Sequence, residues 1–273
     1  MASDVTGGDS PPAAEPTPAE PPVLPEPRET PHRWRFLGLY GVLGIALGAA
    51  AAGLVISLNT KLVTGAGWSS WRPTGGGLGA AGQIAEHVGG EYRLPSGIQM
   101  DDVISKAPSV TVSKTTIPVA YLAVRGSHGA VDQLFQVSGA NTVMFTLCGL
   151  GPACTISTGK PSVARGRLVR REILELALYT FHYDGGIDGV LGLMPPSGTN
   201  KAPAIVYLQR GDLTPELREP LDRTLAPNAP LPATMSLREK QVVESNTGAR
   251  VYSFSLTQAQ DGGAILILNP LAA

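Results

Sequence analysis

The feature that most constrains this chain is an apolar run over residues 36–58, twenty-three consecutive positions without a charged side chain. At about 1.5 Å of rise per residue, a helix of this length crosses a hydrocarbon core of roughly 30 Å. Arg33 and Arg35 precede the run and Lys61 and Arg72 follow it, and positive residues favour the cytoplasmic side. The sequence therefore predicts a single-pass protein of the cell membrane, with a cytoplasmic N-terminus and an extracytoplasmic C-terminal domain.

The same run has two competing interpretations. Small residues at 49–52 would suit cleavage of a signal peptide, but the run exceeds the usual signal-peptide core of about 7–15 residues and follows a long acidic segment. A buried core helix is the second alternative, but the flanks hold nothing that would cap it. We therefore expect an uncleaved anchor in contact with the lipid bilayer.

Gly44, Gly48 and Ala52 recur at four-residue spacing within the run, so they lie on one stripe of the predicted helix. Stripes of small residues allow two membrane helices to approach closely, which would produce a homodimer. Glycine and alanine are also common throughout membrane helices, so the spacing can arise without any contact. Both interpretations remain open from the sequence.

The segment before the run, residues 1–35, contains nine prolines and almost no large apolar side chain. It cannot bury enough surface to offset the entropy lost on ordering, so we expect a disordered cytoplasmic tail that is available to a protein partner. The tail holds six acidic and three basic residues, which leaves 16 acidic and 18 basic residues in the remainder. Neither part has the charge of a nucleic-acid-binding protein.

Residues 59–82 are rich in glycine and predict a flexible linker. Trp68 and Trp71 interrupt this composition. Two tryptophans so near the membrane suit the lipid headgroup zone, and they equally suit packing against the first helix of the following domain. The sequence does not distinguish these two positions.

Residues 83–273 are expected to form an extracytoplasmic domain. Apolar and β-branched runs bounded by turn residues predict strands over residues 117–125, 141–148, 189–194, 204–209, 250–256 and 264–268. Capping residues and apolar periodicity predict helices over residues 83–87, 164–183 and 214–225, and one that follows Ser236. Helices and strands alternate without a regular βαβ period, so the predicted class is α+β.

The only two cysteines are Cys148 and Cys154. Outside the cytoplasm, an even pair at short range is expected to form a structural disulfide. A redox-active pair is a less suitable interpretation because the spacing is not C-x-x-C, and zinc would need two further ligands nearby. The expected disulfide agrees with the predicted topology.

The predicted helix over residues 164–183 begins with an unusual concentration of positive charge. Such charge opposes the helix dipole unless an anion compensates for it, and Glu175 can neutralise part of it by pairing with Arg171. The hypothesis is a surface that contacts anionic lipid headgroups, an envelope polymer or an acidic partner, and the alternative is a solvated face. The residues concerned are Lys160, Arg165, Arg167, Arg170 and Arg171.

No short motif defines a catalytic site. His87, His128 and His182 are isolated in sequence, and His182 lies in the last predicted helical turn, where the dipole favours a cation. The S-x-x-K pattern from Ser157 to Lys160 lacks the partner motifs of penicillin-recognising enzymes. We therefore expect neither a metal ion nor a cofactor.

Two classes of function remain. The first is a membrane-anchored extracytoplasmic binding or scaffold protein, and the second is a tethered, hydrolase-like envelope enzyme whose site is assembled from distant residues. A polar pocket that holds a histidine beside a carboxylate would favour the enzyme. An open groove or an apolar patch would favour the binding protein.

Overall fold

The computed structural model describes residues 68–112, 115–126, 131–196, 204–260 and 263–271, which belong to one compact unit. The expected tail, the membrane span with Gly44, Gly48 and Ala52, and His128 lie outside these residues. Within the described ranges, no helix combines the length and the apolar composition needed to cross a membrane. The predictions for the anchor therefore remain predictions.

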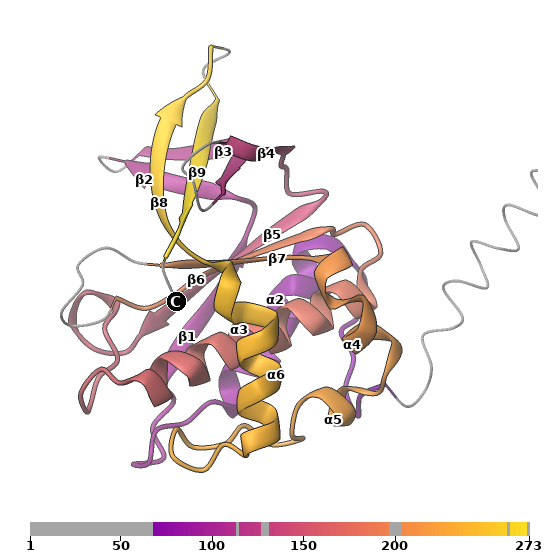
Figure 1. The fold of residues 1–273 in the computed structure, drawn as a ribbon, viewed down its shortest axis with the longest axis vertical. Coiled ribbons are helices and arrows are strands. Elements are labelled where there is room, and N and C mark those ends of the chain that lie inside the picture. The colour runs from indigo at the N-terminus through magenta and orange to yellow at the C-terminus, as the bar shows by residue number, and fades with distance from the viewer. Residues whose placement is uncertain (1–67, 113–114, 127–130, 197–203, 261–262, 272–273) are drawn as a thin grey trace, which may run out of the picture. The chain divides into compact units, whose positions relative to one another are not determined.

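Helices and a mixed sheet share this unit, which confirms the α+β class (Figure 1). The strand order is β1-β5-β6-β7-β8-β9-β3-β2, and β4 also pairs with β3. Two neighbouring pairs, β5 with β6 and β3 with β9, are parallel, and the others are antiparallel. The strands are β1 Asp101–Lys106, β2 Ser109–Val112, β3 Thr115–Arg125, β4 Val131–Gln136, β5 Thr142–Gly149, β6 Gly189–Leu193, β7 Ile205–Gln209, β8 Val251–Gln258 and β9 Ala264–Pro270.

The helices gather against one part of the sheet, whereas the β8–β9 hairpin extends away from them (Figure 1). The longest helix, α3, is the crossover between the parallel strands β5 and β6, a connection that parallel strands require. The hydroxyl of Ser162 caps it by accepting a hydrogen bond from the Arg165 amide at 3.2 Å, as the sequence predicted. The helices are α2 Gly77–Glu91, α3 Val163–Tyr183, α4 Thr214–Arg218, α5 Leu221–Thr224 and α6 Leu237–Thr247, with 3₁₀ turns at Pro152–Cys154, Arg210–Leu213 and Gly248–Arg250.

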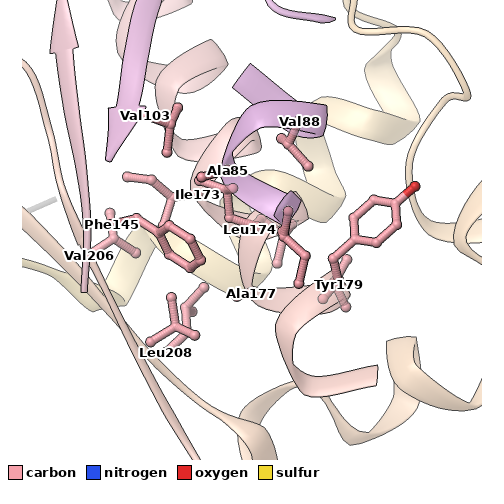
Figure 2. Close-up of a cluster of buried hydrophobic side chains, with 14 of the residues drawn as sticks. Ala85, Val88, Val103, Phe145, Ile173, Leu174, Ala177, Tyr179, Val206 and Leu208 are labelled. Atoms are coloured by element: carbon pink, nitrogen blue, oxygen red, sulfur yellow. The ribbon is translucent and has the colours of Figure 1, made fainter. Parts of the chain in front are cut away.

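The larger core lies between α2, α3 and the strands β1, β5, β6 and β7 (Figure 2). Phe145 and Val206 face the helices from the sheet, and Ile173 and Leu174 meet them from α3. A Cβ atom placed on Gly192 of β6 would lie less than 3.0 Å from three side-chain carbons of Ile173. The helix therefore packs directly on the backbone of the central strand.

A second core covers the opposite face of the same strands. Met144, Leu191 and Tyr207 point to that face, where they pack with Leu122 of β3 and Leu266 of β9. Because successive side chains of a strand point to opposite faces, β5, β6 and β7 are buried on both sides. This double burial explains why these strands are almost continuous apolar runs in the sequence.

The structure differs from the sequence predictions in three respects. The first helix begins at Gly77 rather than at Gln83, so part of the expected linker is folded into the domain. The expected helix over residues 214–225 is divided into α4 and α5, because Pro220 follows Glu219, which is extended. Strands β1, β2 and β4 were not predicted, since their sequences contain too many polar residues to read as buried runs.

Candidate functional site: an acidic pocket beside an aromatic cluster

A fully buried arginine organises the space between α2, α3 and α6. The Arg171 guanidinium donates to Glu239 Oε1 at 2.7 Å, to Glu175 Oε2 at 2.8 Å and to the Ala226 carbonyl at 2.7 Å. It also donates to the hydroxyl of Tyr92. The i,i+4 pair with Glu175 confirms the sequence prediction, but the buried position of Arg171 makes it part of the core rather than of a surface.

The partners of Arg171 stabilise its charge against the cost of burial. Burial lowers the pKa of Arg171, but Tyr92, Glu175 and Glu239 raise it above the usual value, so the guanidinium stays protonated. Burial also raises the pKa of Tyr92 well above its usual value, and its hydroxyl donates to Glu175 Oε2 at 2.7 Å. Glu175 is thus held by two donors on one carboxylate oxygen.

A cavity of about 640 Å³ opens above this network. Its walls come from α2, α3, the segment from Leu221 to Asn228 and the three residues from Trp68 to Ser70. Among the residues that the structure describes, three carboxylates border it and no lysine or arginine does. The lining residues that carry polar side chains are Trp68, Ser69, Ser70, His87, Glu91, Glu175, Tyr179, Asp222 and Asn228.

Aromatic rings form the wall of the cavity that includes the segment from Trp68 to Ser70. The Trp68 ring stacks on His182 and the Trp71 ring on His87, each with centroids 4.0 Å apart. Tyr179 meets both indoles edge to face, and its hydroxyl points away from the sheet (Figure 2). Of the two positions open to the tryptophans, the structure shows packing against the domain.

The two histidines of this wall are uncharged at neutral pH. Burial and the nearby Arg210 lower the pKa of His182 to about 4. Burial lowers the pKa of His87 despite the opposing effect of Glu175 and Glu91. The expectation that His182 is a cation favoured by the helix dipole was therefore wrong, because its environment removes the charge.

The pocket has some of the composition of an enzyme site but not its geometry. His87 lies beside Glu91 and Glu175 on the pocket wall, which is the arrangement that would favour an enzyme. However, its Nε2 atom lies 3.5 Å from the Tyr179 hydroxyl, and within the described ranges no carboxylate hydrogen-bonds its ring. A general base needs a carboxylate or a similar group to orient it, so His87 is not prepared for that role.

The five basic residues predicted to share one surface have separate positions. Arg170 binds Glu244 of α6 at 2.7 Å and Arg167 approaches the same carboxylate at 3.7 Å, so both join α3 to α6. Lys160 is exposed, and Arg165 borders a smaller cavity of about 320 Å³ at the start of α3. Arg171 is inaccessible to any surface ligand. The five basic residues therefore cannot contact one anionic surface together in this structure.

Cys148 and Cys154 form the predicted disulfide, which closes the loop after β5. Ala153 and Cys154 adopt positive φ angles of 53° and 60°, a conformation rare for residues other than glycine. Within the part of the chain that the structure describes, no three His, Cys, Asp or Glu side chains lie close enough to hold a metal ion. The two cysteines therefore have a structural role, in which their disulfide holds the loop after β5.

Sequence reasoning missed the carboxylates of this pocket. Glu91 lies beyond the predicted helix over residues 83–87, Asp222 lies within the predicted helix over residues 214–225, and no spacing connects them with Glu175. One signal was available: a charged residue, Arg171, falls among the apolar positions of α3, which indicates a buried partner. Neither a protein-family model, nor a curated protein, nor a solved structure matches this chain significantly.

Proposed function

We propose that this protein is a membrane-anchored ligand-binding protein whose binding site is the acidic pocket on the extracytoplasmic domain. The observation that carries this proposal is the fixed carboxylate of Glu175, which borders a cavity of about 640 Å³ and is held there by Tyr92 and Arg171. Small-molecule sites are typically cavities of about 300–1,000 Å³ with a few polar groups in fixed positions.

A tethered hydrolase is the second candidate, and only the pocket's composition favours it. Ser69 borders the pocket, but its hydroxyl donates to the Trp71 carbonyl and lies 3.1 Å from the Tyr183 hydroxyl. These contacts hold the segment that follows the expected membrane anchor. Because neither Ser69 nor His87 has the partner that nucleophilic catalysis needs, binding accounts better for the geometry.

Binding can be tested with the full-length protein in nanodiscs of uncharged lipid, titrated calorimetrically with a panel of small amines, carboxylic acids and sugars. We expect at least one class to bind the wild type and to lose affinity when Ala226→Trp fills the pocket. Ala140→Trp, an exposed position outside the pocket, is the matched control and should bind as the wild type does. Absence of binding by every class, or unchanged binding to Ala226→Trp, would overturn the proposal.

The membrane topology has its own test. Single cysteines introduced by Asp4→Cys in the tail and Ser255→Cys on an exposed position of β8 can be labelled in intact cells with an impermeant maleimide. We expect Ser255→Cys to react from outside and Asp4→Cys to react only after the membrane is opened. Labelling of Asp4→Cys in intact cells would contradict the proposed orientation.

A further inference from the structure

We infer that the acidic pocket binds a small linear polyamine, a ligand with two or more ammonium groups joined by methylene chains. This inference rests on the proposed function and assigns a chemical class to its ligand. It depends on the charges that border the cavity, on the state of Glu175, on the separation of the carboxylates and on the apolar floor between them.

The charge of the lining favours a cation. Glu91, Glu175 and Asp222 contribute carboxylates from three different helices, and no lysine or arginine of the described ranges borders the cavity. His87 adds no positive charge, because burial lowers its pKa. Arg171, which holds Glu175, is fully buried and is already shared between Glu175 and Glu239. The cavity therefore attracts positive charge.

Glu175 is an acceptor whose orientation is set before any ligand arrives. Its Oε2 atom receives hydrogen bonds from Tyr92 and Arg171, whereas its Oε1 atom has no hydrogen bond to any residue in the described ranges. The side chain is 13% exposed and lies at the edge of the cavity. A carboxylate held in this way binds an ammonium group without losing side-chain freedom, which strengthens the contact.

The distribution of the acidic groups distinguishes a polyamine from a metal ion. No three acidic, histidine or cysteine side chains within the described ranges are close enough to coordinate one ion. Carboxylates that do not converge on one point cannot coordinate a single metal ion together, but each of them can bind a separate ammonium group. Ala226 and Pro227 are exposed apolar residues of the cavity lining, and they offer a surface for the methylene chain.

The aromatic wall disfavours a sugar as the principal ligand. Sugars commonly stack on an open aromatic face, but the Trp68 ring is covered by His182 and is only 7% exposed. The ring of Trp71 is likewise stacked on His87. The pocket therefore presents carboxylates, which can bind ammonium groups, and apolar side chains, which can contact methylene groups.

The test is calorimetry on the full-length protein in nanodiscs of uncharged lipid, with spermidine and 1,4-diaminobutane as probes and butylamine, glucose, succinate and Mg²⁺ as comparisons. We expect spermidine to bind most tightly and glucose and succinate not to bind. Glu175→Gln should weaken spermidine binding about tenfold or more, because it removes a charge-assisted acceptor. Asp222→Asn, an exposed position outside the Arg171 network, should weaken it about threefold or more.

Glu86→Gln is the matched control, since it removes an exposed carboxylate of α2 that neither borders the pocket nor belongs to the Arg171 network. It should leave spermidine affinity within about twofold of the wild type. Equal loss of affinity in Glu86→Gln and Glu175→Gln, or equal binding of spermidine and butylamine, would overturn the polyamine inference. If glucose or succinate binds instead and Ala226→Trp abolishes it, the inference fails while the proposed function stands. If no probe binds, both fail.

Discussion

The carboxyl groups of Asp101 of β1 and Glu172 of α3 interact in the core, where neither side chain is exposed to solvent and no other described residue donates a hydrogen bond to them. Burial raises the pKa of Asp101 to about 7, with Asp102 adding to the effect. Burial and Asp101 raise the pKa of Glu172 well above its usual value, and the adjacent Arg171 opposes this only in part. Burial of the two carboxyl groups together therefore favours protonation of the pair.

This pair makes stability depend on pH in a defined direction. The pKa of Asp101 is 3.8 before the shift and about 7 in the folded protein, so the folded state holds more protons across that interval. Its contribution to the free energy of unfolding is complete at low pH and is lost as the pH rises through about 7, by up to about 1.4 kcal/mol per pH unit. Asp101→Asn should abolish this loss.

The measurement is urea unfolding of the wild type and of Asp101→Asn across the interval from about pH 4 to about pH 8. The difference between the two curves reports Asp101 together with its effect on the pKa of Glu172. We expect the wild type to lose stability relative to the variant as the pH rises. A constant difference would show that Asp101 does not change its protonation in this range.

His182 should act in the opposite direction. Its pKa falls from 6.5 to about 4 on folding, so the unfolded state binds more protons between these values. Stability from this residue is present above 6.5 and is lost as the pH falls towards about 4. His182→Phe keeps an aromatic ring against Trp68 and should remove the loss, as thermal unfolding across this interval would show. A wild-type acid sensitivity retained in His182→Phe would contradict the assignment.

The strands and the long helix were predictable because their signals are local. The runs at β5, β6 and β7 are apolar along almost their whole length, and Ser162 stands directly before the helix that it caps. The two cysteines are six residues apart, so their pairing could also be predicted from the local sequence. Each of these features is determined by a few neighbouring residues.

The pocket was not predictable because its contacts join distant parts of the chain. Arg171 lies 68 residues from Glu239, 79 from Tyr92 and 55 from Ala226, and only Glu175 is a sequence neighbour. In the sequence, Arg171 looks like the last member of a solvated basic cluster. Strand β1 escaped prediction for a related reason, since the buried carboxyl group of Asp101 interacts with Glu172 of α3, which is distant in the sequence.

Arg171 should be among the most sensitive positions of the domain. Arg171→Met fits the length of the side chain but leaves Glu175 and Glu239 as neighbouring buried carboxylates without a cation, and we expect a loss of about 3–5 kcal/mol. Arg171→Lys retains the charge but cannot reach three separate acceptors, so it should also destabilise the fold. Arg170→Met, which breaks an exposed pair with Glu244, is the control and should cost about 1 kcal/mol or less. Equal effects of Arg171→Met and Arg170→Met in denaturant unfolding would show that the buried network has no special role.

The contact between Gly192 and Ile173 determines how closely α3 approaches the sheet. A Cβ atom at residue 192 would overlap the Ile173 side chain, so Gly192→Ala must shift the helix or force Ile173 from its rotamer, at a cost of about 1–3 kcal/mol. Because Arg171, Glu172 and Glu175 all belong to this helix, the shift should also weaken ligand binding in the pocket. Ile173→Ala leaves a cavity when introduced alone, but combined with Gly192→Ala it makes room for the new methyl group. The double variant should therefore be less destabilised than the sum of the two single variants, and a strictly additive loss in urea unfolding would show that the two residues do not interact.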